Sequence, residues 1–294
     1  MRGIFMRDFV ISTETNSDMS QEFLQSNDIL VIPHYYNVED DMYGDGNELT
    51  IEEFYNEMRA GKKAGTAASN PAVIDEKFTE VAKQGKDILH ISFSSQLSCG
   101  CQNIINGGNA IKEEYPDMTI EVVDTLSATL GEGILLQMAV NMKKEGKTIT
   151  EVAEKLREVA PHLNVLLTVD DLDTLYRGGR LSKTSASVGG VIGIKPIISV
   201  DAEGKLAATG KARGRKKAFN MLLETMENNL GSYKDKQEFI GIIHGDAMED
   251  ALVLKKMVEE KFGYDNFVIE PIGPSIGAHT GPGAIGLIFL GETR

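Results

Sequence analysis

The sequence predicts an α/β fold made of two α/β domains. The first has a mainly parallel sheet with helices on both faces, and the second has a mixed sheet with a β-hairpin. Short runs rich in Val and Ile alternate with helical patterns along most of the chain, which is typical of parallel sheets covered by helices. This texture changes near residue 160. Because 294 residues also fit two domains of roughly 150 residues each, we place the domains at residues 1–160 and 161–294.

The N-terminal half carries the parallel pattern. Helices are predicted between its strands, and two of them begin with a capping box, at Thr50 with Glu53 and at Thr148 with Glu151. A third helix, "PAVIDEKFTEVAKQG", has apolar residues at helical spacing and ends at Gly85. The predicted strands are residues 9–12, 29–32, 87–92 and 120–123.

The C-terminal half predicts a hairpin that turns around Asp201 to Gly204. An amphipathic helix from Lys216 to about Asn229 follows, and then strand, helix and strand before the closing "GAIGLIFLG". Ligands of open α/β sheets bind beyond the carboxyl ends of the strands. The loops at 66–71, 92–98 and 273–283 are therefore the candidates to meet at such a site.

Composition excludes several classes of function. The net charge of −14 argues against nucleic-acid partners and against docking on anionic membranes. No apolar window is long enough for a membrane span, and Arg7 and Asp8 interrupt the apolar N-terminus, so we expect neither stable membrane insertion nor a signal peptide. One residue separates Cys99 from Cys101, which suits neither a disulfide nor a zinc site. We expect reduced thiols, no bound metal and a cytoplasmic location.

The stretch "GPSIGAHTGPGAIG", residues 273–286, contains a G-x-S-x-G motif at Ser275 and a histidine, His279, four residues later. This spacing raises the alternative of a serine-dependent acyl-ester hydrolase. A nucleophile elbow needs a helix after the serine, whereas the Gly-Pro-Gly run at 281–283 is expected to break one. We therefore interpret Ser275 as a turn residue and keep the hydrolase as the alternative function.

Two basic segments stand out in this acidic chain. "RGGRLSKTS" resembles a P-loop, but both glycines that the Walker A pattern requires are missing, so we expect no ATP site. Its arginines and the cluster in "KARGRKK" are either a solvated charge run or a docking surface. The arginines concerned are Arg177, Arg180, Arg213 and Arg215.

Polar loops supply candidate ligand contacts. Ser98, in "HISFSSQLSCGCQN", lies at a predicted helix N-terminus, where backbone N–H groups favour a carboxylate or phosphate. A plain N-cap is the alternative role for this serine. Thr66, in "GTAASNP", offers a free hydroxyl.

These segments, in this order, resemble the DegV family, the fatty-acid-binding B subunits of bacterial fatty acid kinase. The resemblance covers most of the chain, and the terminal histidine motif is the most specific part of it. Two departures stand out: Glu14 replaces a usual aspartate, and Cys99-Gly100-Cys101 replaces Gly-Thr-Tyr, which bears on the pocket shape and the preferred acyl chain. The matching segments are "ISTETNSDM", "LTIEEFYNEMRAGKKAGTAASNP", "ISFSSQLSCGCQN", "YRGGRLS" and "GAHTGPGAIGLIF".

The resemblance implies a DegV-like protein that holds a long-chain fatty acid between its halves. It presents the carboxylate to a separate ATP-dependent fatty acid kinase, which makes acyl-phosphate for phospholipid synthesis. The chain itself is then not an enzyme, and its ligand is the fatty acid rather than a cofactor. Thr66 and Ser98 would hydrogen-bond the carboxylate, with His279 beside it. The resemblance places Arg180, Arg213 and Arg215 toward the kinase. The expected supporting residues are Ser95, Gly277, Gly281 and Gly283, the glycines allowing backbone to approach the ligand closely.

Overall fold

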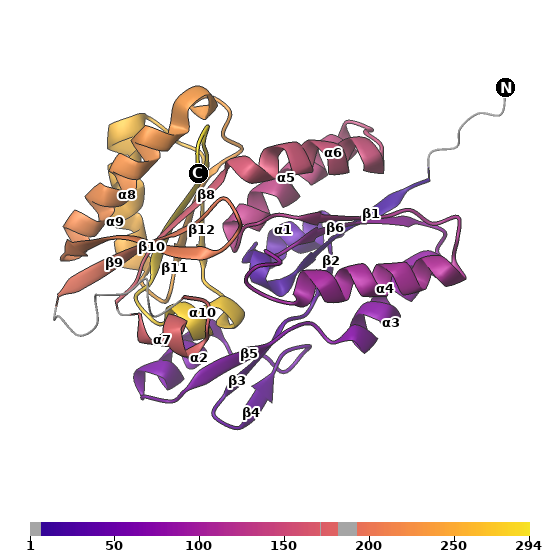
Figure 1. Cartoon of the computed structure of the whole chain (residues 1–294), viewed down its shortest axis with the longest axis horizontal. Coiled ribbons are helices and arrows are strands. Elements are labelled where there is room, and N and C mark those ends of the chain that lie inside the picture. Colours follow the sequence, from indigo (N-terminus) through magenta and orange to yellow (C-terminus); the bar gives the residue numbers. More distant parts are fainter. Residues whose placement is uncertain (1–6, 171, 182–192) are drawn as a thin grey trace.

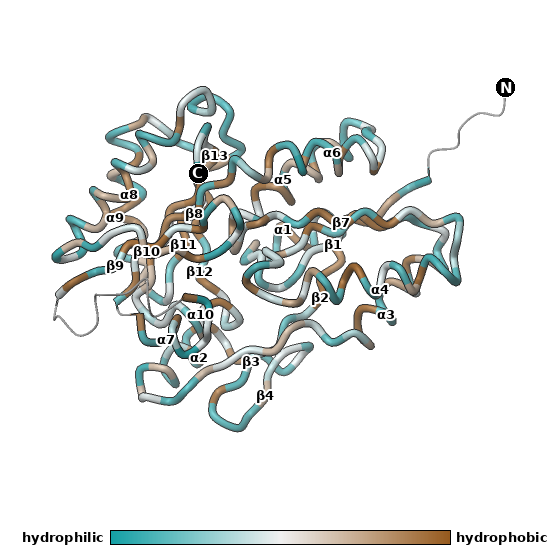
Figure 2. Tube along the Cα trace, viewed as in Figure 1, coloured by the Kyte–Doolittle hydropathy of each residue, from teal (hydrophilic) through white to brown (hydrophobic). Residues whose placement is uncertain are grey.

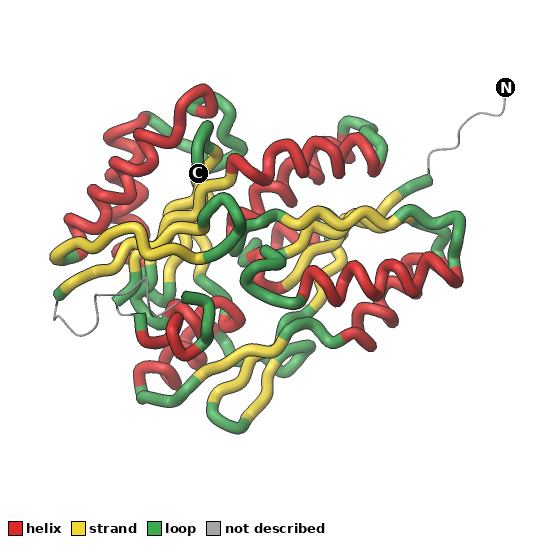
Figure 3. Tube along the Cα trace, in the orientation of Figure 1, coloured by secondary structure: helices red, strands yellow, loops and turns green. Residues whose placement is uncertain are grey.

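The structure is a computed structural model that describes residues 7–170, 172–181 and 193–294. Residues 1–6 and Lys183-Thr184, which belong to the signal-peptide and P-loop arguments, lie outside the described residues. Three sheets organise the described chain, shown by the yellow strands in Figure 3. The predicted α/β fold class is confirmed.

The first sheet is fully parallel, with the strand order β2-β1-β6-β7. Helices α3 and α4 pack on one face, and α5 and α6 pack on the other (Figure 1). Both predicted capping boxes are present, at the starts of α2 and α6. The strands are β1 (Phe9–Glu14), β2 (Leu30–Ile32), β6 (Asp87–Ser92) and β7 (Ile120–Asp124). The helices of this half are α1 (Gln21–Ser26), α2 (Ile51–Arg59), α3 (Pro71–Lys83), α4 (Gly100–Glu114), α5 (Leu130–Lys144) and α6 (Ile149–Val159).

A small antiparallel sheet, in the order β4-β3-β5, was not predicted. Its strands are only three or four residues long and largely half-exposed, so they lack the apolar run that marks a buried strand. The stacked rings of Tyr36 and Tyr43, 5.4 Å apart, and the buried Phe54 of α2 hold it together. The strands are β3 (Tyr35–Val38), β4 (Asp41–Tyr43) and β5 (Ala64–Ala67).

The C-terminal sheet is mixed, with the order β10-β9-β8-β13-β11-β12. Only β11 and β12 pair in parallel, and the predicted hairpin joins β9 to β10. Helices α8 and α9 cover one face of this sheet (Figure 1). The strands are β8 (Leu163–Thr168), β9 (Ile194–Val200), β10 (Leu206–Arg213), β11 (Ile240–His244), β12 (Phe267–Pro271) and β13 (Ile285–Leu290). The helices are α7 (Asp173–Arg177), α8 (Arg215–Leu230), α9 (Met248–Phe262) and α10 (Pro274–Thr280). Short 3₁₀ turns are η1 (Thr15–Ser17), η2 (Ala160–His162) and η4 (Gly231–Tyr233).

Helix α5 packs against strands of both large sheets, with β1 and β6 on one side and β8, β11 and β13 on the other. Its residues Ile134, Leu135 and Leu136 are fully buried. In Figure 2 brown, hydrophobic stretches run along the strands, and teal, hydrophilic stretches are frequent in the outer loops. Helix α6 ends at Val159 and β8 begins at Leu163, so the chain changes sheet near residue 160. The division into two domains at that point stays a prediction.

The prediction for residues 273–283 was wrong in one respect. Residues Pro274–Thr280 form the helix α10, so Ser275 lies in a helical first turn. Pro274 is favourable at the first helical position because it needs no hydrogen-bond acceptor there. Gly281, with φ of 75°, ends the helix. The Gly-Pro-Gly run therefore stops a short helix rather than preventing one.

Candidate functional site

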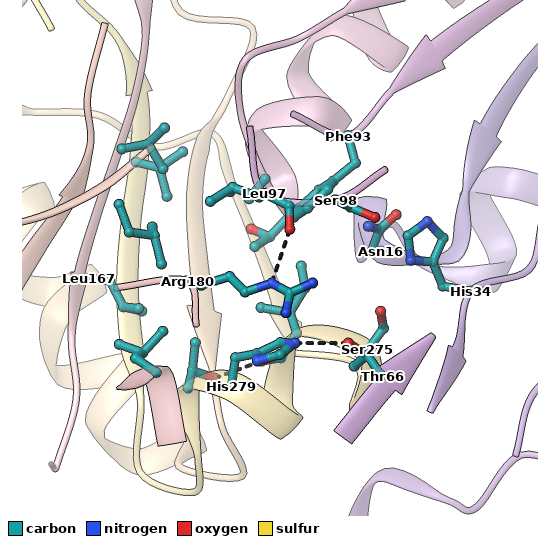
Figure 4. A pocket seen from close by; sticks show the side chains of 18 of the residues that line it. Asn16, His34, Thr66, Phe93, Leu97, Ser98, Leu167, Arg180, Ser275 and His279 are labelled. Carbon is teal, nitrogen blue, oxygen red and sulfur yellow. Dashed lines mark hydrogen bonds between the residues drawn. The ribbon is translucent and has the colours of Figure 1, made fainter. Parts of the chain in front are cut away.

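A cavity of about 250 Å³ lies between the parallel sheet and the C-terminal sheet (Figure 4). The three segments that were predicted to meet all line it, through Thr66 to Ala68, through Phe93 to Ser98, and through Ser275 to Thr280. Elements distant in sequence therefore build one site.

The two sides of the cavity differ in polarity. Apolar side chains of the C-terminal sheet form one side, which includes Leu167. Polar side chains gather on the opposite side in Figure 4 and make what we call the polar end. Apolar lining residues include Val165, Leu167, Ile198, Val200 and Leu206, and the polar end consists of Asn16, His34, Thr66, Ser98 and His279. Such a cavity suits a long apolar ligand with one polar group.

Thr66 and His279 meet at the polar end, as predicted from their segments. The Oγ1 atom of Thr66, on β5, lies 2.9 Å from Nε2 of His279, on α10. Burial, with a smaller contribution from the positive charge of Arg180, lowers the pKa of His279 to about 4. The imidazole is therefore neutral near pH 7, with one nitrogen as donor and the other as acceptor. Its Nδ1 atom has no hydrogen-bond partner among the described residues.

Gly178, in the "RGGR" segment, lies against the His279 ring. A Cβ atom at this position would lie 2.2 Å from Nδ1 of His279. The glycine therefore leaves the space that the imidazole ring occupies. Sequence analysis singled out the arginines of this segment and missed this role.

Ser98 lies two residues before the first residue of α4, and its Oγ atom accepts a hydrogen bond from the Gly100 N–H at 3.1 Å. The N-cap residue of α4 is Cys99, so Ser98 bonds the first helical N–H from one residue before the N-cap position rather than from the predicted N-cap position itself. Its hydroxyl hydrogen stays available to a ligand in the cavity that it lines. The bond to the helix start and the predicted ligand contact are compatible at Ser98.

Arg180 is half-buried and lines the cavity instead of projecting freely into solvent. Its guanidinium donates to the carbonyl oxygen of Leu97 at 3.1 Å and to that of Gly178 at 2.5 Å. It also borders a second, more open hollow that Ser95, Lys205 and Ser98 line. Arg180 therefore stands between the inner cavity and the outer hollow.

The other predicted basic residues differ in availability. Arg213 is exposed at the end of β10. Arg215 is half-buried and pairs with Asp170 at 3.1 Å and with Asp250 at 2.9 Å. Of these two predicted docking arginines, only Arg213 has an exposed side chain for a partner.

The four residues predicted to support the ligand contacts are one serine and three glycines, and each glycine packs near other protein groups. A Cβ atom at Gly277 would lie 2.6 Å from the Tyr55 hydroxyl, so this glycine allows α2 to pack closely. Gly281 ends α10, and Gly283, with φ of 77°, packs near the Asp170 carboxylate. The expected approach of these glycines to the ligand stays a prediction. Ser95 is exposed and lines the outer hollow.

The hydrolase alternative lacks its required contact. Nε2 of His279 is engaged by Thr66, and within the described chain no hydrogen bond joins His279 to Ser275. The strand–helix order around Ser275 does resemble an elbow, since β12 precedes α10. A general base must reach the hydroxyl proton that it removes, and here the imidazole is directed to a different hydroxyl.

Sequence analysis missed the polar residues on the wall opposite the C-terminal sheet. Glu14 is fully buried and accepts hydrogen bonds from Nε2 of His34 at 3.2 Å, from Oγ of Ser92 at 3.2 Å and from the Phe93 N–H at 2.7 Å. Burial alone would raise the pKa of Glu14, but the hydrogen bond with His34 helps lower it well below its usual range. Glu14 is thus an ionised anchor that orients His34 at the cavity.

The two departures from the family pattern meet at this anchor. A Cβ atom at Gly100 would lie 2.8 Å from Oε1 of Glu14 and 3.1 Å from Nε2 of His34. The longer glutamate therefore uses space that a glycine leaves free. Cys99 is exposed, Cys101 is buried, and burial raises the pKa of Cys101 to about 11.

Within residues 7–170, 172–181 and 193–294, no group of three or more His, Cys, Asp or Glu side chains is arranged to hold a metal ion. Over the same residues, every helix is too short or too polar to cross a membrane.

Comparisons with known proteins agree on one family. A family model described as "Uncharacterised protein, DegV family" matches residues 8–292. A DegV domain-containing protein of Clostridium perfringens is 38% identical over 291 residues, which cover 98% of this chain and 99% of that protein.

Solved structures share the fold. The fatty acid binding DegV family protein of Streptococcus agalactiae has a TM-score of 0.85 and 26% identity, covering 97% of this chain and 99% of its own. A stearic-acid-binding protein from Eubacterium ventriosum has a TM-score of 0.87 at 23% identity, covering 97% and 98%.

The charge of Arg180 gives a prediction for His279. We expect the His279 ring to titrate at a pKa of about 4, followed by NMR of the ring protons. The substitution Arg180→Gln removes a positive charge that disfavours the imidazolium, so the pKa should rise. A pKa near the ordinary value of about 6.5 in the unsubstituted protein, or no rise in the variant, would contradict this electrostatic account.

The Gly100–Glu14 contact gives a second prediction. Gly100→Ala should lower the free energy of unfolding by about 1–3 kcal/mol, the usual cost of overpacking. Adding Glu14→Asp retracts the carboxylate, so the loss in the double variant should be smaller than the sum of the two single losses. Urea unfolding of the four proteins measures this coupling.

The matched control is Gly108→Ala in the same helix. A Cβ atom there would meet Cγ2 of Ile120 at 3.2 Å, away from Glu14. Its effect should simply add to that of Glu14→Asp. Additive effects for Gly100→Ala as well would show that the predicted contact carries no coupling.

Proposed function

The chain belongs to the DegV family, and from this premise we propose that it binds a long-chain fatty acid in the cavity and presents the carboxylate to a separate ATP-dependent kinase. The observation that carries the proposal is the cavity itself, with an apolar side and a single polar end. The Streptococcus agalactiae relative, which has the same fold, is a fatty acid binding protein.

Affinity and orientation come from different parts of such a ligand. Burying a methylene contributes ~0.8 kcal/mol, so about fifteen of them contribute roughly 12 kcal/mol. Association costs at least ~4 kcal/mol. Each hydrogen bond to a charged group contributes about 1.5–3 kcal/mol. The tail therefore dominates the affinity, and the polar end fixes where the carboxylate lies.

The polar end can supply donors to an ionised carboxylate. In the tautomer that suits an anion, Nε2–H of the neutral His279 donates to Oγ1 of Thr66, 2.9 Å away. The Thr66 hydroxyl is then free to donate to the ligand. The Ser98 hydroxyl provides a second donor, and the Arg180 guanidinium adds positive charge at the same cavity. These residues bind and orient the carboxylate, and in this proposal none of them reacts with it.

The transfer step itself needs little from the fatty-acid side. A carboxylate oxygen attacks the γ-phosphorus of ATP, the bond to the bridging oxygen breaks, and acyl-phosphate and ADP are the products. The chief requirement is an oxygen held in line with the leaving group. The proposal includes a cytoplasmic location, a supply of acyl-phosphate to phospholipid synthesis and no catalysis by this chain alone.

The binding proposal makes a direct prediction. Native mass spectrometry of freshly purified protein, followed by solvent extraction, should identify a stoichiometric fatty acid. Thr66→Val and Ser98→Ala should each weaken oleate binding roughly tenfold, because each removes a hydrogen bond to a charged group. Thr225→Val is the control, since the Thr225 hydroxyl donates within α8 to the Met221 carbonyl oxygen. If the purified protein has the mass of the bare chain, and if this mass does not change when oleate or palmitate is added, the proposal is wrong.

The docking proposal makes a separate prediction. Arg213→Glu should abolish phosphorylation of the bound fatty acid by the cognate kinase and leave the amount of bound lipid unchanged, because Arg213 is exposed and outside the cavity lining of the described chain. Lys155→Glu, on the distant helix α6, is the charge-matched control. Undiminished phosphorylation of the Arg213 variant would show that the kinase docks elsewhere.

A further inference from the structure

Asn16 is a buried amide that lines the cavity. It lies in the 3₁₀ turn η1, is 1% exposed and belongs to the polar end of the cavity. Its Oδ1 atom has no hydrogen-bond partner among the described residues. Leaving a buried polar atom without a hydrogen bond destabilises a protein, and native proteins retain few such atoms. A ligand group in the cavity can pair with this amide, either as a donor to Oδ1 or, once the amide is flipped, as an acceptor from Nδ2–H.

Two neighbouring residues of the polar end each have a protein hydrogen-bond partner. Nε2 of His34 donates to Glu14 at 3.2 Å, and Thr66 pairs with His279 at 2.9 Å. In Figure 4 the Asn16 amide lies beside Ser98 and His34, across the polar end from Thr66. It therefore faces the space between the two residues proposed to hold the carboxylate.

We infer that Asn16 is a further ligand-binding residue, whose amide hydrogen-bonds the carboxyl group of the ligand; this inference rests on the proposed fatty-acid binding. A carboxamide suits this place because it offers both a donor and an acceptor. Its oxygen and nitrogen exchange places by a rotation that keeps the same shape. The Nδ2–H group then donates to an ionised carboxylate. The amide also adds no charge beside the buried anion Glu14.

The test uses oleate labelled with ¹³C at the carboxyl carbon and, separately, at the terminal methyl carbon. Asn16→Leu replaces the amide by an apolar group of similar size. It should weaken oleate binding about tenfold and shift the ¹³C resonance of the bound carboxyl carbon, while the methyl resonance stays in place. Because the resonances of both ends of the oleate are observed, a lost contact with the carboxyl group can be distinguished from a general change in the fold.

Ser17→Ala is the matched control. Ser17 lies in the same turn, is 1% exposed and also has an unpaired Oγ atom, but it is outside the cavity lining within the described chain. It should change neither the affinity nor either resonance. If Asn16→Leu does not fold, Asn16→Asp, which keeps the shape of the side chain, replaces it. That variant should also weaken oleate binding and shift the carboxyl resonance.

The possible outcomes distinguish the Asn16 inference from the proposed fatty-acid binding. A shift of the methyl resonance alone would place Asn16 along the tail and overturn the inference. Unchanged affinity and unchanged resonances in the Asn16 variant would overturn it too, with oleate binding itself intact. Failure of the unsubstituted protein to bind oleate would overturn the proposed function, and the Asn16 inference with it.

Discussion

The hydrogen bond between Thr66 and His279 joins residues that are 213 positions apart, and the polar end of the cavity depends on it. It requires the small sheet of the N-terminal half to reach α10 of the C-terminal half. The Tyr55 hydroxyl reinforces this meeting by donating to the Ile272 carbonyl oxygen at 2.9 Å, just before α10. Gly277 removes the side chain that would keep α2 away. A site built across the two halves in this way cannot form in either half alone.

Two buried carboxyl groups behind the polar end, those of Glu14 and Glu132, differ in ionisation. Glu14 stays ionised because protein donors surround it, whereas burial and the nearby Glu14 raise the pKa of Glu132 well above its usual range. The Thr13 hydroxyl bonds Glu132 at 2.5 Å. Two buried carboxyls in one region cannot both ionise at low cost, so their environments separate them. Of these two carboxyl groups behind the polar end, Glu14 is the one that carries the negative charge.

The sequence was most informative where periodicity and local rules govern structure. The strand at 87–92, both capping boxes and the β9–β10 hairpin were predictable because each depends on neighbouring residues. The small sheet lacked such a signal. Helix α10 was not predicted because the glycines that end it argued against a helix. Asn16 and His34 were missed for another reason. Nothing near them in sequence shows that a turn after β1 and the residue before β3 will face the same cavity.

Arg180 borders both the cavity proposed to bind the fatty acid and the outer hollow. Sequence reasoning assigned it to the kinase, yet its guanidinium lies at the inner cavity and bonds the backbone on either side, at Leu97 and Gly178. The same residue borders the outer hollow, so it marks the place where the polar end opens outward. In the proposed complex the phosphoryl donor approaches the carboxylate from the side of the outer hollow, since strands of the C-terminal sheet line the apolar side of the cavity. In the proposed complex Arg180 lies between the bound carboxylate and the kinase, and the exposed Arg213 is the proposed contact with the kinase.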